Sequence, residues 1–480
     1  MTVLAIDQGT SGTKAIVVDP EDGVVGLAEV PVHPRYLPGG GVEQDPGELL
    51  DSVLSAGRSA VAQAARPIDA VSLANQGETV LAWDPDTGRP LTAAIVWQDR
   101  RADAVCATLG EDAETLAART GLVLDPYFSA PKMTWLRRTM TTGGVVTTSD
   151  SWLLHRLTGA FVTDATTASR SLVVELGARE WSAELLALFG LDAERLPAIV
   201  ANDEIIGSTA EFGDDLPVGG IVVDQQAALL AEGCLDEGMA KCTFGTGAFL
   251  LANTGAAGVR STSGLTSSLA WRVADTDTFC VDGQVYTAAS AVRWLSALGI
   301  IASAEEIDAL AADDSAGVLC VPAFAGLAAP WWKATATASI SGMTLSTGRE
   351  HLVLAVLQGI AAQIAELVSA IDADTVTPLR ALRADGGLTQ SRVLMQACAD
   401  ILQLPVEIYP SAHATALGAA ALARLSLQPD QTLRDVVADW QPSATYEPNW
   451  TASRAAEFRS KWRQLAATTY SGEDLHDHHL

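Results

Sequence analysis

Two segments, one at the start of the chain and one near its middle, share the same order of strand, glycine–threonine turn and strand. The first is VLAIDQGTSGTKAIVVD at 3–19, and the second is MAKCTFGTGAFLLANTG at 239–255. In each, apolar residues flank a short run of Gly and Thr, which is the composition of a tight hairpin turn. This repeat indicates a duplicated fold, in which two similar halves hold one ligand between them.

Length and charge narrow the class of protein. At 480 residues the chain exceeds the usual size of one hydrophobic core, so we expect two domains, and CLDEGM interrupts the apolar pattern to divide the chain into 1–235 and 236–480. The net charge of −28 argues against nucleic acid or an anionic membrane as a partner. The start, MTVLAIDQGT, lacks the basic segment of a signal peptide, and the most apolar stretch, 352–371, is broken by polar residues. We therefore expect a cytoplasmic protein in which 352–371 is a buried helix.

The segment 75–101, NQGETVLAWDPDTGRPLTAAIVWQDRR, places polar residues at both ends of a predicted hairpin. The strand-like runs VLAW and AAIVW flank the turn residues DPDTGRP. The hairpin would therefore bring both polar clusters to the same end of a sheet. One end carries Asn75 and Glu78, and the other begins with Trp97. Carboxylates and amides bind hydroxyls, and an aromatic ring packs against a carbon skeleton. The segment therefore predicts a site for a small polyhydroxylated molecule.

Asp7 ends the first predicted strand and is followed by GTSGTK. The glycines permit a tight turn, and the backbone N–H groups with the hydroxyls of Thr10, Ser11 and Thr13 can surround an oxyanion. The spacing is not that of a Walker A loop, and no helix pattern follows directly. A phosphate-binding loop and an ordinary hairpin turn both fit these residues.

Three later segments each fit both a ligand-binding role and a purely structural one. FGTGAF at 244–249 lacks the third glycine of a dinucleotide fingerprint, so a second phosphate-facing hairpin is the better interpretation. At 383–408, a strand, Gly-Gly, helix and strand follow one another, and the glycines either admit a ligand or only form a turn. Asp224, in IVVDQQAALLA, is either a helix N-cap or, with Asp7, the second carboxylate of a phosphoryl-transfer site. Core packing also explains the aromatic residues Trp97, Tyr127 and Phe249.

Taken in order, these segments resemble the FGGY family of carbohydrate kinases and, within it, the glycerol kinases. The similar segments run from AIDQGTSGTKAIVVD, GVEQDP and IVWQDRR through TGLVLDPYFSAPKMTWL, VTDATTASRSL and DQQAALL to VPAFAGLAAPWW, ADGGLTQSRVLMQACADIL and ATALGAA. The resemblance implies an α/β fold of two ribonuclease-H-like domains, of the actin and sugar-kinase type, with catalysis in the interdomain cleft. It also implies ATP and Mg²⁺ as cofactors, a small polyol or sugar as substrate, and a homodimer or homotetramer.

The resemblance assigns roles to individual residues. Asp224 matches the catalytic base, and Asp7 and Asp224 match the carboxylates beside magnesium. Residues matching the ATP site are Thr10, Ser11, Lys14, Gly245, Thr246, Ala289, Gly387 and Ser391. Residues matching the substrate pocket are Gly77, Glu78, Trp97, Tyr127, Asp224, Gln225 and Phe249.

Several positions depart from the family pattern. Gly77 stands where glycerol kinases carry an arginine that binds a terminal hydroxyl, and losing that hydrogen bond weakens binding by about 1.5–3 kcal/mol. Ala289 and Ser391 replace a glycine and an asparagine at the nucleotide, and Lys333 and Thr337 replace an aspartate and an arginine.

Since the aspartates and both phosphate loops are kept, we expect a polyol or sugar kinase for which glycerol is a poor substrate. The volume vacated at Gly77 would admit a longer polyol or ketose. The alternatives are a genuine glycerol kinase, a non-catalytic sugar or nucleotide sensor, and a chaperone-like or filament-forming ATPase.

Overall fold

Two twisted sheets of related topology form the core of the protein, one in each half of the chain. The computed structural model describes residues 1–470. The first sheet has the strand order β12-β13-β6-β1-β2-β3. Its strands β1, β6 and β13 are mutually parallel, whereas β2 and β3 continue from β1 as the antiparallel meander that the sequence predicts. The bounds are β1 Val3–Gln8, β2 Gly12–Asp19, β3 Gly23–Pro31, β6 Ala70–Asn75, β12 Gly207–Thr209 and β13 Leu216–Val223.

The second sheet repeats this plan around β14. Its order is β16-β17-β15-β14-β20-β21-β22, with β15 and β17 antiparallel on one side of β14 and β20 and β21 parallel on the other. Thus β14 and its Gly-Thr turn occupy the place that β1 and its turn hold in the first sheet, which confirms the duplicated α/β fold. The bounds are β14 Ala240–Phe244, β15 Ala248–Gly255, β16 Thr266–Val273, β17 Thr276–Val285, β20 Leu382–Asp385, β21 Val406–Ile408 and β22 Ala444–Tyr446.

A smaller five-stranded sheet extends the N-terminal half and holds the predicted hairpin of 75–101. In it, β7 pairs antiparallel with β8 through Val80 and Ile95. Its strands are β4 Arg35–Leu37, β5 Gly41–Gln44, β7 Val80–Trp83, β8 Ala94–Ile95 and β9 Val145–Thr148. Two strand pairs complete the structure: β10 Val162–Asp164 with β11 Ala198–Val200, and β18 Leu319–Val321 with β19 Ser339–Ser341.

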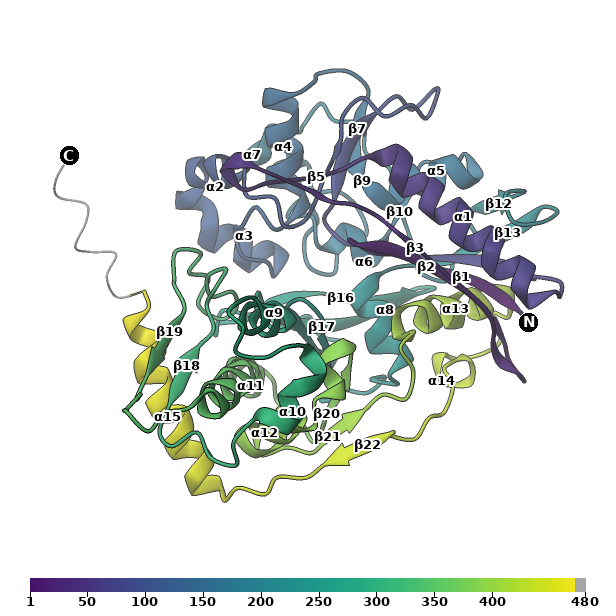
Figure 1. Ribbon diagram of the computed structural model, residues 1–480. Helices are drawn as coiled ribbons and strands as arrows, with labels where there is room; N and C mark the ends of the chain where they lie inside the picture. The colour runs from purple at the N-terminus through teal and green to yellow at the C-terminus, as the bar shows by residue number, and fades with distance from the viewer. Residues whose placement is uncertain (471–480) are drawn as a thin grey trace.

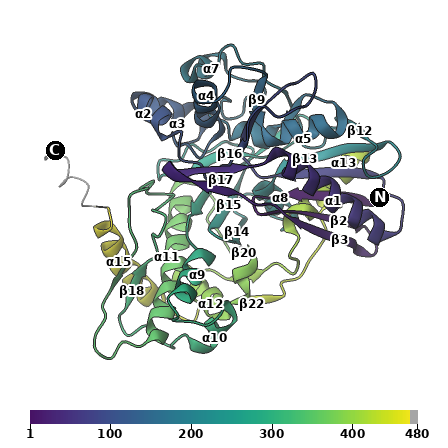
Figure 2. The same ribbon diagram turned by 45° about the horizontal axis from the view of Figure 1, so that its top comes forward.

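Helices cover both large sheets, and Figures 1 and 2 show the N-terminal half in purple to blue against the C-terminal half in teal, green and yellow. α1 begins where the sequence predicts, since Asp45 accepts a hydrogen bond of 2.7 Å from the N–H of Gly47. The bounds are α1 Pro46–Ala64, α2 Asp103–Thr108, α3 Ala113–Thr120, α4 Ser129–Thr139, α5 Ser149–Thr158, α6 Ala165–Ser169, α7 Ala183–Phe189, α8 Asp224–Ala231, α9 Ala289–Ala297, α10 Ile307–Leu310, α11 Arg349–Asp374, α12 Arg392–Leu402, α13 Ala414–Leu427, α14 Leu433–Val436 and α15 Ala452–Thr468, with 3₁₀ turns at Pro38–Gly40, Gly110–Asp112, Ala304–Glu306 and Gly387–Gln390.

The helix α11 contains the apolar stretch 352–371 and lies inside the C-terminal half. By length and composition alone it is the one helix of residues 1–470 that could cross a membrane. Its apolar side chains, however, belong to the largest hydrophobic cluster of the protein, where they pack with β14, β15 and β17. Burial in this core accounts for the apolar composition of α11, as expected from the sequence.

The helix α13 crosses from the C-terminal half to the first sheet. Ala416, Ala420 and Ala423 pack with Val3 and Ile16 of that sheet, beside the N-terminus in Figure 1. Small residues make this approach possible, because a Cβ added at Gly220 of β13 would lie 2.4 Å from the backbone nitrogen of Ala423. The two halves are therefore joined by packing as well as by the chain, and the boundary near residue 235 stays a prediction.

Candidate active site

The carboxyl ends of the parallel strands bring the predicted acidic residues together. Asp7 lies near the end of β1, Asn75 ends β6, and Asp224 directly follows β13. In the second sheet, Asp385 ends β20 beside β14. The charges of Asp224 and Asp385 both act on Asp7, so the ends of the two sheets face a common region.

A small cavity of about 20 Å³ opens beside Asp224. That volume holds about one or two water molecules. Glu78, Asp224 and Asp282 contribute three carboxylates to its walls, and Arg170 contributes a guanidinium. The full lining comprises Glu78, Tyr127, Arg170, Val223, Asp224, Gln225, Gln226, Phe249, Leu251, Asp282 and Gly283. Five residues of the predicted substrate pocket thus meet at one place, namely Glu78, Tyr127, Asp224, Gln225 and Phe249.

Gly77 leaves no open volume, contrary to the expectation from the sequence. It does not line the cavity, and a Cβ added to it would lie 2.8 Å from the Cγ2 of Val223. The side chain of Val223 therefore already occupies the space into which a residue at position 77 would extend. Gly77 therefore does not enlarge the pocket for a longer polyol.

A guanidinium reaches Glu78 from another part of the chain, that of Arg170. Arg170 follows α6, its side chain is only 6% exposed, and its Nε donates to Oε1 of Glu78. Its Nη1 also donates to Oδ1 of Asp282 at 3.0 Å. Burial raises the pKa of Glu78, and the charge of Arg170 offsets part of that rise. From the sequence we assigned no role to Arg170 or Asp282, although a lone acid within the apolar strand TFCVDGQV was a usable signal.

Trp97 stands behind the cavity and does not line it. Its ring meets Tyr127 edge-on at 5.6 Å and Phe249 at 5.8 Å between centroids, so the three predicted aromatic residues pack as one cluster, of which Tyr127 and Phe249 line the cavity. Its indole N–H donates to Thr10 Oγ1 at 2.9 Å, and Thr10 Oγ1 in turn donates to Gln76 at 3.1 Å. The hydroxyl of Thr10 is thus engaged in holding the first phosphate loop.

The two predicted phosphate loops and the third glycine turn border the same region. Ser11 is exposed at the tip of the β1–β2 turn, and Lys14 Nζ donates to the carbonyl of Ala412 at 3.4 Å. A Cβ added at Gly387 would meet nothing within 4 Å, whereas Gly386, with φ +94°, lies against the carbonyl of Phe244. Such an open glycine beside a strand end is where a ligand can approach the backbone.

The remaining nucleotide candidates are placed by hydrogen bonds around the second loop. Ala289 N–H donates to the carbonyl of Gly245 at 3.1 Å, and the hydroxyl of Ser290 donates to the carbonyl of Thr246 at 3.0 Å. Ser391 instead caps α12 and donates to Asp308 at 2.6 Å, so its hydroxyl is already engaged. The nucleotide contacts of these residues stay predictions.

Burial and mutual repulsion dominate the electrostatics of the aspartates. Burial, with the charge of Asp224, raises the pKa of Asp7 to about 7. Burial and Glu78 raise the pKa of Asp224 to about 6, while the ammonium of Lys241 opposes the rise. Lys241, fully buried, donates to Gln225 Oε1 at 2.6 Å and was not singled out from the sequence.

These residues fit a magnesium–nucleotide complex. Asp7 and Asp224 are carboxylates that repel each other, a repulsion that a divalent cation relieves, and oxygen ligands are those that Mg²⁺ prefers. Asp385 Oδ1 is buried without a hydrogen-bond partner at the same edge. Neither Lys333 nor Thr337 lines the cavity; both lie in the loop between β18 and β19.

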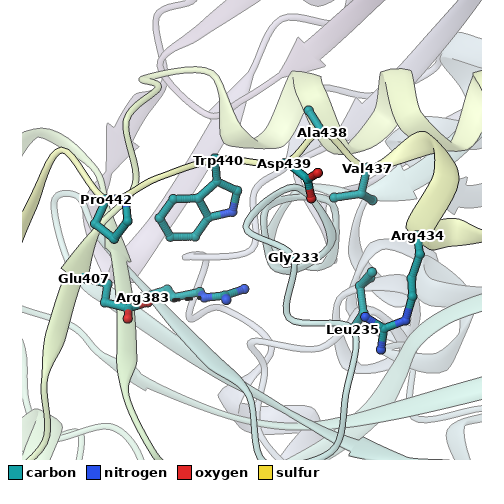
Figure 3. A pocket seen from close by; sticks show the side chains of 10 residues that line it. All are labelled: Gly233, Leu235, Arg383, Glu407, Arg434, Val437, Ala438, Asp439, Trp440 and Pro442. Atoms are coloured by element: carbon teal, nitrogen blue, oxygen red, sulfur yellow. Dashed lines mark ion pairs between the residues drawn. The ribbon is translucent and has the colours of Figure 1, made fainter.

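A larger cavity of about 320 Å³ lies beside the loop after α14 (Figure 3). Its arginines are already paired: Arg383 lies 3.7 Å from Glu407 and 4.9 Å from the ring centre of Trp440, and Arg434 pairs with Asp236. No predicted site residue lines it. We therefore place the active site at the smaller cavity.

Comparison with known proteins defines the class. Residues 2–231 match the N-terminal domain of the FGGY family of carbohydrate kinases, and residues 240–427 match its C-terminal domain. The chain belongs to the FGGY family of carbohydrate kinases and is thus an ATP-dependent sugar or polyol kinase.

Individual relatives are similar over nearly their whole length. A glycerol kinase of Bordetella parapertussis is 42% identical, with 96% of each chain covered. The structure of a Plasmodium falciparum glycerol kinase with ADP superposes with a TM-score of 0.90 at 31% identity, covering 98% of both chains. A xylulose kinase from Brucella ovis reaches 0.88 at 26% identity, covering 98% of this chain and 99% of that one. The resemblance to glycerol kinases is confirmed.

Proposed function

We propose that the protein transfers the γ-phosphoryl group of ATP to a primary hydroxyl of a small, neutral polyol. The observation that carries this proposal is the cavity at Asp224, whose walls combine hydrogen-bond acceptors with the rings of Tyr127 and Phe249. Hydroxyl groups donate to such acceptors, and the aromatic rings pack against carbon.

The charge of the cavity supports a neutral substrate. Among residues 1–470, three carboxylates and one guanidinium line it, so an anionic sugar acid would meet net negative charge. A polyol carries no charge to repel and has hydroxyls that can donate to the carboxylate of Glu78. We therefore expect sugar acids to be rejected.

In the proposed mechanism, Asp224 accepts the proton of the attacking hydroxyl. The N–H of Gln225 donates to Asp224 Oδ1 at 2.7 Å, which fixes the orientation of the carboxylate. The turns at Thr10 and Gly245–Thr246 hold the phosphates through backbone N–H groups. Magnesium, when bound with ATP, would be held by Asp7 and Asp224 and would neutralise phosphate charge.

The space beside Gly77 bears on which polyol is used. Val223 fills that space, so the pocket is not enlarged there for an acceptor longer than glycerol. A genuine glycerol kinase is thus the second candidate, favoured by this packing. The absence of a side chain at Gly77 still supports weaker binding of glycerol than an arginine there would give.

The decisive experiment is a coupled ADP-release assay with polyols and ketoses of three to six carbons and with a sugar acid. Turnover of a neutral polyol and rejection of the acid support the main proposal. Glycerol as the best substrate, with a KM in the low millimolar range or below, would instead establish the glycerol kinase. A thermal shift with ligand but no turnover on the whole panel would contradict both and indicate a sensor.

We further propose a cytoplasmic homodimer or homotetramer, on the strength of the family resemblance. Sedimentation velocity at micromolar concentration tests the assembly. A monomer under these conditions would contradict it.

A further inference from the structure

Arg170 is placed to link the two halves of the protein at the floor of the polyol cavity. Its backbone belongs to the N-terminal half, after α6, and it donates to Glu78 of the same half. It also donates to Asp282 of β17, in the C-terminal half, at 3.0 Å, and lies 3.4 Å from the hydroxyl of Ser268 on β16. One buried guanidinium therefore holds one carboxylate from each half.

Both carboxylates depend on this partner for charge compensation. Glu78 and Asp282 are 4% and 5% exposed, and leaving a buried charge unpaired is costly. Burial raises the pKa of Glu78 and the charge of Arg170 opposes that rise, so removal of Arg170 favours the protonated acid, which loses acceptor capacity for a substrate hydroxyl. Although burial disfavours the charged guanidinium, Asp282 and Glu78 raise the pKa of Arg170 above its ordinary value, so the cation persists.

The backbone at Glu78 also needs support. Its φ of +57° lies in the left-handed region, which a residue with a long side chain adopts only when its surroundings hold it there. The turn has one local hydrogen bond, from Thr79 N–H to the carbonyl of Gly77 at 2.7 Å. The contact with Arg170 is the side-chain interaction that orients the carboxylate of Glu78 toward the cavity.

We propose that Arg170 is a positioning residue for polyol recognition, and that Asp282 of the C-terminal half fixes Arg170 and thereby Glu78. Polyol affinity then depends on the packing of the two halves, because a residue outside the N-terminal half holds the substrate-binding glutamate in place. The positioning role of Arg170 and Asp282 rests on the proposed function only for the identity of the ligand.

The test compares Asp282→Asn with a matched control on the same strand. Asp277 also pairs with a buried arginine, Arg272, at 2.6 Å, but neither lines the cavity. We expect Asp282→Asn to raise the KM for the polyol by about tenfold, the effect of losing one charged hydrogen bond, with kcat within about threefold. Asp277→Asn should leave the polyol KM within about twofold.

Substitution of Arg170 should distinguish positioning from folding. Arg170→Met removes both contacts and should raise the polyol KM by about a hundredfold or more, whereas Arg170→Lys, which retains a charge but not the fork geometry, should recover part of the loss. The KM for ATP should not change in any of these variants. Equal losses in Asp282→Asn and Asp277→Asn would overturn the proposal.

A second readout is independent of turnover. Amide hydrogen exchange of residues 76–80 should accelerate in Asp282→Asn and Arg170→Met, but not in Asp277→Asn, because the turn at Glu78 loses its anchor. Unchanged exchange in all three variants would overturn the positioning role, even if the wild type phosphorylated no polyol. Absence of polyol turnover by the wild type, with accelerated exchange in the first two, would refute the proposed function alone.

Discussion

The indole N–H of Trp97 donates a 2.9 Å hydrogen bond to the hydroxyl of Thr10 and so joins the aromatic cluster of Trp97, Tyr127 and Phe249 to the predicted first phosphate loop. Thr10 also receives Gln44, whose Nε2 donates to its carbonyl at 2.6 Å. The backbone turn at Thr10 is therefore held by two side chains, those of Trp97 and Gln44. The proposed substrate site and the proposed nucleotide site therefore share a structural support.

Trp97→Phe should weaken the binding of both the polyol and ATP. The ring packing on Tyr127 and Phe249 is largely kept, but one hydrogen bond is lost, which is worth about 0.5–1.5 kcal/mol or about a two- to tenfold rise in KM for polyol and for ATP. The control is Trp83→Phe, since Trp83 donates in the same way to Thr147 at 2.9 Å away from the cavity. Steady-state kinetics of the two variants measure both KM values. If the KM for polyol and the KM for ATP are the same in Trp97→Phe as in Trp83→Phe, the hydrogen bond from Trp97 to Thr10 does not support both sites.

Asp224→Asn should abolish transfer while leaving nucleotide binding near normal. Loss of a general base costs about 10²–10⁴-fold in rate, and the amide keeps the shape of the carboxylate. Single-turnover kinetics and ADP titration calorimetry measure the two properties. Activity within tenfold of the wild type would refute Asp224 as the base.

The rate should fall in acid with the titration of Asp224. Burial, reinforced by Glu78, raises its pKa to about 6, and a base must be deprotonated to accept a proton. The value of kcat/KM should therefore be constant above about pH 7 and fall about tenfold per pH unit below 6. Glu78→Gln, which removes one raising charge, should move this limb to lower pH. A flat profile down to pH 4.5 would contradict the assignment.

Gly77→Arg alone should not improve glycerol as a substrate. Its Cβ would lie 2.8 Å from Val223 Cγ2, so the new side chain must displace that residue. The double variant Gly77→Arg with Val223→Ala removes the clash and should lower the KM for glycerol about tenfold relative to the single variant. Glycerol kinetics on both variants and on Val223→Ala test this. Full improvement in the single variant would show that Val223 moves freely.

Gly418→Ala should destabilise the protein and slow catalysis together. Its Cβ would lie 1.9 Å from the carbonyl oxygen of Ala227 in α8, the helix that begins at Asp224. Overpacking of this kind costs about 1–3 kcal/mol. Urea unfolding and kcat are the measurements, with Gly110→Ala, which meets nothing within 4 Å, as the control. Equal stability of the two variants would contradict the close packing of α13 on α8.

The sequence by itself determined the repeated strand–turn–strand units, and with them the two sheets, because glycine–threonine turns between apolar runs are local features. It also placed Asp7 and Asp224 at strand ends, where parallel strands bring them together. The family resemblance assigned Glu78 and Tyr127 to the substrate pocket, because the motifs that contain them are continuous in the chain. These properties depend on neighbours in sequence, which pattern reasoning can detect.

Only the tertiary structure decided what surrounds those residues. Val223 fills the space at Gly77, although 146 positions separate them in the chain. Arg170 reaches Glu78 and Asp282 across 92 and 112 positions. The volume and charge of a pocket arise from such distant side chains, whose meeting depends on how two sheets and their helices pack, and no local pattern in the sequence records that packing.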